Sequence, residues 1–163
     1  MIHTLDVMLS QLGVREATGN NDGVPAERYA DGDEVMWCAA IVLWCNTYSQ
    51  DAKIARDTKE RYTLRSVTAL EAAMKERGWW LPPTTYTDAI KPNDLVLQAW
   101  TTSDAGAPGG KRITGRQVAI VESVEGAALH CIGGNVDNQV KRVVRRWGSS
   151  TITGYVRIPI TEG

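Results

Sequence analysis

The chain has 163 residues, 43% of them hydrophobic and 23% charged, so it can bury a core without disulfides or a structural metal. Its formal net charge of −1 gives no reason to expect nucleic acid or an anionic membrane surface as a partner. The N-terminus has no signal-peptide pattern, and no stretch is long enough to span a bilayer. We therefore expect one domain over residues 1–163, made in the cytoplasm and soluble.

The first half of the sequence predicts helices. Apolar residues at helical spacing indicate an amphipathic helix over 2–12 that ends at Gly13, and a short helix is expected around 26–30. An apolar helix begins near Cys38. The charged stretch 51–65 predicts a solvated connector or an exposed helix, and a further amphipathic helix starts at Val67 and ends at Gly78.

The second half predicts strands. Alternating and β-branched segments indicate five of them, over 95–100, 117–124, 127–132, 139–146 and 154–158. Between the first two strands, residues 101–115 are rich in Gly, Ser, Thr and Asp, which favours a loop. Helices followed by antiparallel strands make an α+β fold, with N-terminal helices packed on a C-terminal sheet.

The cysteines predict free thiols. Cys38 and Cys45 are seven residues apart on one expected helix, which separates their Cα atoms by about 10 Å, too far for a disulfide. Two isolated histidines and three scattered cysteines lack paired ligand spacing, so we expect neither a metal nor a cofactor.

Cys38 is the candidate nucleophile of the chain. It follows the acidic, glycine-bearing segment 31–34 and stands where the apolar helix should begin. Unpaired N–H groups and the positive end of the helix dipole favour a thiolate at such a position. The alternative is a buried cysteine that packs as a small hydrophobe.

Six segments, in order, resemble papain-like cell-wall hydrolases of bacteria and phages, a group related to the CHAP amidase/peptidases and the NlpC-type endopeptidases. They are GVREATG at 13–19, WCAA at 37–40, KPNDLV at 91–96, QVAIV at 117–121, GGN at 133–135 with Val140, and GYVRIP at 154–159. The resemblance runs through most of the chain. It implies a papain-like fold and cleavage of amide bonds in peptidoglycan, as an endolysin or as a phage particle or tail component that reaches the wall after delivery.

The resemblance also implies roles for individual residues. Cys38 matches the nucleophile and Asn135 the polar residue that orients the base. Trp37 and Gly134 flank these positions and could line a substrate cleft, although core packing is the commoner role of a tryptophan. In such a site the thiolate attacks the carbonyl and a histidine protonates the departing amine.

The chain departs from the family pattern at the base position, where Gln117 replaces the histidine. The two histidines of the chain are His3, to which we assign no role, and His130. In an unbroken strand His130 faces away from Asn135, unless a bulge at Gly133 reverses the alternation. Three functions therefore stay open: a peptidoglycan hydrolase, a catalytically inactive relative that binds the wall or serves a particle, and a thiol-dependent hydrolase of another amide.

Basic residues gather near the C-terminus, at Lys141, Arg142, Arg145, Arg146 and Arg157. The usual meaning of such a cluster is a solvated strand face, and an anionic polymer is the other interpretation.

Overall fold

The computed structural model describes residues 1–18, 23, 29, 37–103 and 111–160. Its helices are α1 (Thr4–Ser10), α3 (Cys38–Thr47), α4 (Thr58–Leu64), α5 (Val67–Arg77) and the short 3₁₀ helix η1 (Thr87–Ala89). Its strands are β1 (Trp80–Leu81), β2 (Leu95–Ser103), β3 (Lys111–Glu125), β4 (Ala128–Val136), β5 (Gln139–Arg146) and β6 (Ile152–Val156).

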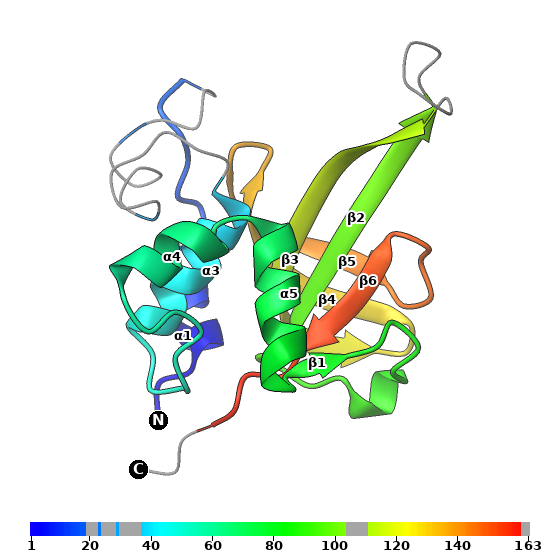
Figure 1. Ribbon diagram of the computed structural model, residues 1–163, viewed down its shortest axis with the longest axis horizontal. Coiled ribbons are helices and arrows are strands. Elements are labelled where there is room, and N and C mark those ends of the chain that lie inside the picture. Colours follow the sequence, from blue (N-terminus) through cyan, green and yellow to red (C-terminus); the bar gives the residue numbers. More distant parts are fainter. Residues whose placement is uncertain (19–22, 24–28, 30–36, 104–110, 161–163) are drawn as a thin grey trace.

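All six strands form one antiparallel sheet in the order β1-β6-β2-β3-β4-β5. Figure 1 shows α1, α3 and α4 grouped on one side of this sheet, with α5 next to them, and α3 packs directly against β3 and β4. The α+β prediction, with N-terminal helices on a C-terminal antiparallel sheet, is therefore confirmed. Among the described helices, none has both the length and the apolar character needed to cross a membrane.

Helix α3 is the centre of the core because its sequence is apolar on nearly every side. Its residues Ala39 to Leu43 are at most 1% exposed. Met8 of α1 covers it on one side, and Leu70 and Met74 of α5 belong to the same buried cluster. A helix without a polar face must be enclosed by other elements, which explains why α1, α4 and α5 gather around it.

The sheet has two differently packed faces. Val118, Ile120 and Ile132 belong to the cluster that contains α3, and we call their side the α3 face. Ala119, Val121, Leu129, Cys131 and Tyr155 form a second buried cluster, and we call their side the opposite face. Since side chains alternate along a strand, each residue of β3 or β4 can be assigned to one face from its neighbours, away from bulges.

Helix α5 ends where the sequence predicts, and helix α1 does not. Helix α5 ends at Gly78, whose φ of 76° is the left-handed conformation that glycine adopts without strain. Helix α1 is shorter than predicted, since it ends at Ser10 and the turn to Gly13 is not helical. Within 51–65 the expected exposed helix is α4, which begins after Asp57, whose side chain accepts the N–H of Glu60.

The predicted loop over 101–115 is wrong at both of its ends. Residues 101–103 extend β2 and residues 111–115 belong to β3, so the two strands form a long hairpin that projects beyond the rest of the sheet (Figure 1). Backbone pairing of residues 101–103 with residues 111–113 outweighs the loop composition. The short helix expected around 26–30 lies outside the described residues, apart from Tyr29.

Strand β6 spans Ile152–Val156, two residues earlier than the predicted 154–158, and two further strands depart from the sequence analysis. Strand β4 continues past Ile132 to Val136, with a bulge between Gly133 and Val136. The two-residue strand β1 was not predicted, because the pair Trp80–Leu81 is too short to show any periodicity. It forms the edge of the sheet by pairing with β6.

Candidate functional site

Cys38 is the first residue of α3, as the sequence predicts. Its sulfur lies against β3, where the backbone N–H of Val118 is directed at it, and the N–H of Ala39 in the first turn is directed at it as well. Backbone donors at a helix start are the kind of environment that stabilises negative charge on sulfur. The position of Cys38 therefore fits a nucleophile.

Burial acts in the other direction on the same sulfur. Cys38 is 7% exposed, and this desolvation raises the pKa of its thiol above the usual value, outweighing the backbone donors that lower it. The effect of burial is therefore larger than the effect of the helix start. Cys38 is a neutral thiol at neutral pH. Cys45 and Cys131 are more deeply buried, at 0% and 1% exposed, and burial raises the pKa of both.

Three separate segments meet at the start of α3. A Cβ placed on Gly134 would lie 2.4 Å from a methyl carbon of Ile41 and 3.1 Å from the Trp37 ring, so β4 passes directly against the first turn of α3. Asn135 follows in the bulge with a positive φ of 58°. The start of α3, the segment of β3 at Val118 and the Gly-Gly-Asn segment of β4 are thereby brought together, although they are far apart in the sequence.

Trp37 is completely buried at this meeting point. Its indole N–H donates to a carboxylate oxygen of Glu16 at 2.5 Å, and its ring lies against Tyr29 with 5.6 Å between centroids. Of the two roles considered for Trp37, the structure places it in core packing. Glu16 thus fixes the residue that precedes Cys38.

Gln117 lies one residue before Val118, and its side chain lies on the opposite face of the sheet, like that of Ala119. Its Oε1 accepts a 2.7 Å hydrogen bond from Nη2 of Arg145, which reaches across from β5. Its Nε2 is 3.4 Å from where a Cβ on Gly133 would lie. Gln117, the residue in the base position, is therefore hydrogen-bonded to the guanidinium group of Arg145.

His130 is far from Cys38 along the sheet. It pairs with Ser123 of β3, and five residues of strand separate Ser123 from Val118, which is about 16 Å. Its Nε2 lies 3.4 Å from a carboxylate oxygen of Glu125. The bulge after Gly133 does not bring it closer, because the bulge lies beyond His130 in the chain.

His3 belongs to a buried network that the sequence analysis missed. Its Nδ1 is 2.8 Å from Asp51, and Asp51 also accepts hydrogen bonds from both donors of Thr4 and from Asn93. Thr4 in turn accepts from Asn46, which is eight residues and so about 12 Å along α3 from Cys38. This network joins the N-terminus to the far end of α3. No periodicity in the sequence signals it.

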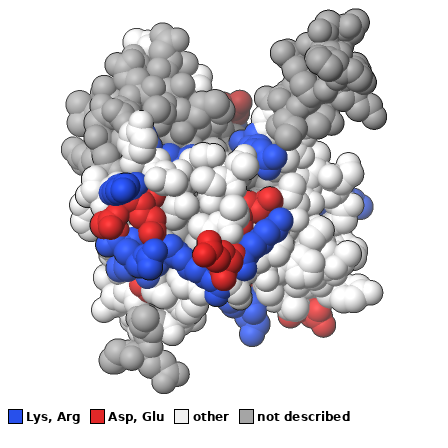
Figure 2. All heavy atoms as spheres, viewed as in Figure 1, with Lys and Arg blue, Asp and Glu red and all other residues white. Residues whose placement is uncertain are grey.

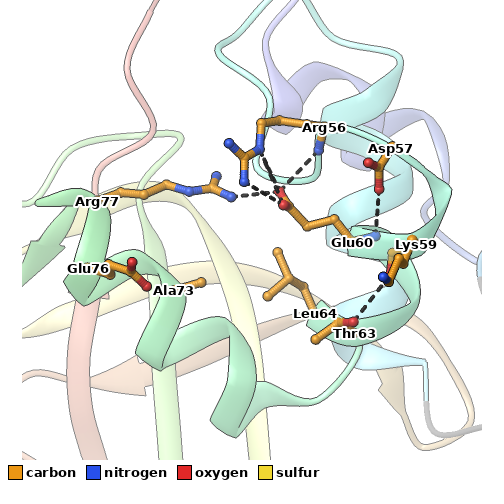
Figure 3. Close-up of a pocket in the computed structure, with 9 residues that line it drawn as sticks. All are labelled: Arg56, Asp57, Lys59, Glu60, Thr63, Leu64, Ala73, Glu76 and Arg77. Carbon is orange, nitrogen blue, oxygen red and sulfur yellow. Dashed lines mark hydrogen bonds and ion pairs between the residues drawn. The ribbon is translucent and has the colours of Figure 1, made fainter.

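A hollow of about 520 Å³ lies between α4 and α5 (Figure 3). Among its lining residues, Glu60 accepts hydrogen bonds from Arg56 at 2.8 Å and from Arg77 at 2.7 Å. Figure 2 shows Lys and Arg side chains adjoining Asp and Glu on this side of the molecule. Because Glu60 is paired with two arginines and no cysteine or histidine lines this hollow, it is a poor candidate for cysteine chemistry.

The basic residues near the C-terminus do not form one patch. Lys141 bonds Asp137, Arg142 bonds Glu122, and Arg157 bonds Asp94. Among the residues that the structure describes, no three His, Cys, Asp or Glu side chains group as metal ligands.

A comparison of the chain with known protein families, with curated proteins and with solved structures finds no match.

Proposed function

We propose that this chain is a papain-like cysteine hydrolase that cuts an amide bond in the peptide part of peptidoglycan, with Cys38 as its nucleophile. The observation that carries the proposal is the meeting of Cys38, the Val118 segment and the Gly134–Asn135 segment at the start of α3. These are three of the six segments that resemble the cell-wall hydrolases. Peptidoglycan is the proposed partner, reached as an endolysin or as part of a phage particle or tail.

The chemistry follows from the groups at the site. The sulfur of Cys38 attacks the amide carbonyl, a thioester forms, and the amine leaves with a proton; water then cleaves the thioester and releases the acid. The N–H groups of Val118 and Ala39 support negative charge at the sulfur before attack. Neither of the two imidazoles of the chain is close enough to take the thiol proton, so water or hydroxide takes it.

This arrangement predicts a slow enzyme. An acid–base residue contributes about 10² to 10⁴ in rate, and Gln117 cannot exchange a proton near neutral pH. The proposed hydrolysis should therefore be weaker by about that factor than hydrolysis by an equivalent site with a histidine.

A second candidate function is a catalytically inactive relative that binds wall peptides or serves a particle. Two observations favour it: burial raises the pKa of Cys38, and the amide of Gln117 is bonded to Arg145. A site with these two properties can still bind a wall peptide although it no longer cleaves one.

The experiment that separates the two functions measures new amino groups in purified peptidoglycan incubated with the protein. Hydrolysis of an amide releases one amino group per bond, whereas cleavage of the glycan releases reducing sugar ends. We expect amino groups from the wild type and none from Cys38→Ala, with Cys45→Ala as the matched control that keeps activity. Binding to the wall without release of amino groups would refute the hydrolase and establish the second candidate.

A further inference from the structure

The edge of β3 that faces away from β2 is paired with β4 along only part of its length. The pairing of β4 with β3 ends at the pair of Gly133 with Ala119, and at Gly134 the chain of β4 lies against the first turn of α3. Within the described residues, no strand pairs with this edge of β3 over 111–118, although β2 pairs with the other edge along this length. We call this part the open edge of β3. A strand edge without a partner can accept a further strand.

The direction of the backbone groups along β3 follows from alternation. The N–H and the C=O of Val121 are both bonded to the two residues directly before β2. Successive residues of an antiparallel strand direct these groups to alternate edges, and the register with β2 is unbroken from here to Gly115. The backbone groups of Gln117 therefore point to β2, whereas those of Val118 and Arg116 point to the open edge.

The open edge begins at the proposed nucleophile. A continued register would pair Val118 with Gly134, but a Cβ on Gly134 would lie 2.4 Å from Ile41, so β4 has already moved onto α3 at this point. The N–H of Val118 is directed instead at the sulfur of Cys38, as the alternation requires. The next backbone groups along the same edge belong to Arg116, two residues or about 7 Å away.

Arg116 can be reached from solvent. It is partly exposed, whereas Val118 is completely buried. The β2–β3 hairpin that carries Arg116 projects beyond the rest of the sheet (Figure 1). Among the described residues, none bonds the backbone N–H or C=O of Arg116. One donor and one acceptor in the plane of a sheet are the groups that an extended peptide backbone complements.

We infer that an extended peptide binds to the open edge of β3 as an added antiparallel strand, with the N–H and C=O of one residue bonded to the C=O and N–H of Arg116. The peptide then follows the line that β4 leaves at Gly134, and an amide about two residues along it lies at the sulfur of Cys38. The inference deepens the proposed function and rests on it for one point: that the peptide is part of the wall. Because backbone groups make these bonds, binding depends little on the side chains of the peptide.

Hydrogen exchange of the backbone amides, measured by NMR on the ¹⁵N-labelled full chain, tests the pairing. The probe is the neutral peptide N-acetyl-Ala-Ser-Ala-Ser-amide, and its control is the same peptide with methylated backbone nitrogens, which block strand pairing. At about ten times the Kd of the probe, exchange at Arg116 should slow about tenfold. Exchange at Gln117 should not change, because its N–H is already bonded to β2. The methylated peptide should change neither.

Variants separate the backbone of Arg116 from its side chain. Arg116→Pro removes one N–H at the open edge and none that pairs with β2, and proline is tolerated at such edges. It should weaken binding of the neutral peptide about fivefold or more, because a hydrogen bond is lost. Arg116→Ala keeps the N–H and should bind as tightly as the wild type; a loss equal to that of Arg116→Pro would overturn the pairing. If Arg116→Pro does not fold, the exchange pattern of the wild type still decides.

Failure of this inference differs from failure of the proposed function. Slowed exchange at Arg116 without release of amino groups from peptidoglycan would support the open edge and refute the hydrolase. Release of amino groups would leave the hydrolase standing, while no slowing at any soluble concentration of the probe, or equal slowing by the methylated peptide, would overturn the added strand. Slow exchange at Arg116 in the free protein would also overturn it, because the edge would already be occupied.

Discussion

At Cys38 two physical effects of opposite sign act on one sulfur atom. The start of α3 and the N–H of Val118 favour the thiolate, whereas desolvation favours the thiol, and desolvation is the larger effect. The sequence predicts the first effect, because a helix start is visible in the apolar pattern. It does not predict the second, because burial depends on how β3 and β4 pack against α3.

The first prediction concerns thiol reactivity. Iodoacetamide followed by peptide mapping should label Cys38 before Cys45 and Cys131, since Cys38 has the largest exposed fraction of the three. The rate should still be rising above pH 9, because burial raises the pKa of Cys38 above its usual 9.0. Dominant labelling of Cys131 would be inconsistent with the assigned nucleophile.

The second prediction concerns the base position. Gln117→His should change amino-group release from peptidoglycan by less than about tenfold, because the side chain at position 117 lies on the opposite face of the sheet from Cys38, where an imidazole does not reach the thiol proton. A rise of about 10² or more in a folded variant would show that this side chain does reach the sulfur.

The contact between α3 and β4 joins one element that the sequence predicts fully to one that it predicts only in part. The helix and five of the strands, β2 to β6, follow from periodicity, because each is a local pattern. The bulge after Gly133 and the lengthened β2–β3 hairpin do not, since they depend on pairing between strands. Neither interpretation of the basic cluster anticipates the bond from Arg145 to Gln117, because that bond crosses from β5 to β3.

The third prediction tests this contact. Gly134→Ala should lower the free energy of unfolding by about 2 kcal/mol or more, because the added methyl would overlap Ile41 and touch Trp37. Chemical denaturation measures the change. Gly148→Ala is the matched control: it has a positive φ but nothing within 4 Å, so its cost should stay near about 1 kcal/mol. Equal costs for the two variants would show that β4 does not press on α3.

At the scale of the whole molecule, Asp51 connects parts that are distant in sequence. Its carboxylate accepts from His3 and Thr4 near the N-terminus and from Asn93 just before β2. Burial raises the pKa of Asp51, but these hydrogen bonds together outweigh that effect and lower the pKa below its usual 3.8. The ionised carboxylate therefore stabilises the folded chain.

The fourth prediction follows from the sign of that shift. The contribution of Asp51 is fully present above the unfolded-state pKa and is lost as the pH falls through the lower folded-state pKa, so stability should decline below about pH 4. Asp51→Asn should cost about 1 to 3 kcal/mol at neutral pH and flatten this acid decline. Thermal unfolding between pH 7 and pH 2 measures both. If Asp51→Asn lost as much stability at low pH as the wild type, that loss would come from other carboxylates.

Whether Cys38 forms a covalent intermediate is tested by mass spectrometry of the protein quenched in acid during incubation with soluble wall peptides. The account predicts a thioester adduct on the peptide that contains Cys38, with the mass of the acyl part of the cleaved substrate, and no adduct on Cys45 or Cys131. Release of amino groups while Cys38 stays unmodified, or equal release by Cys38→Ala, would contradict it.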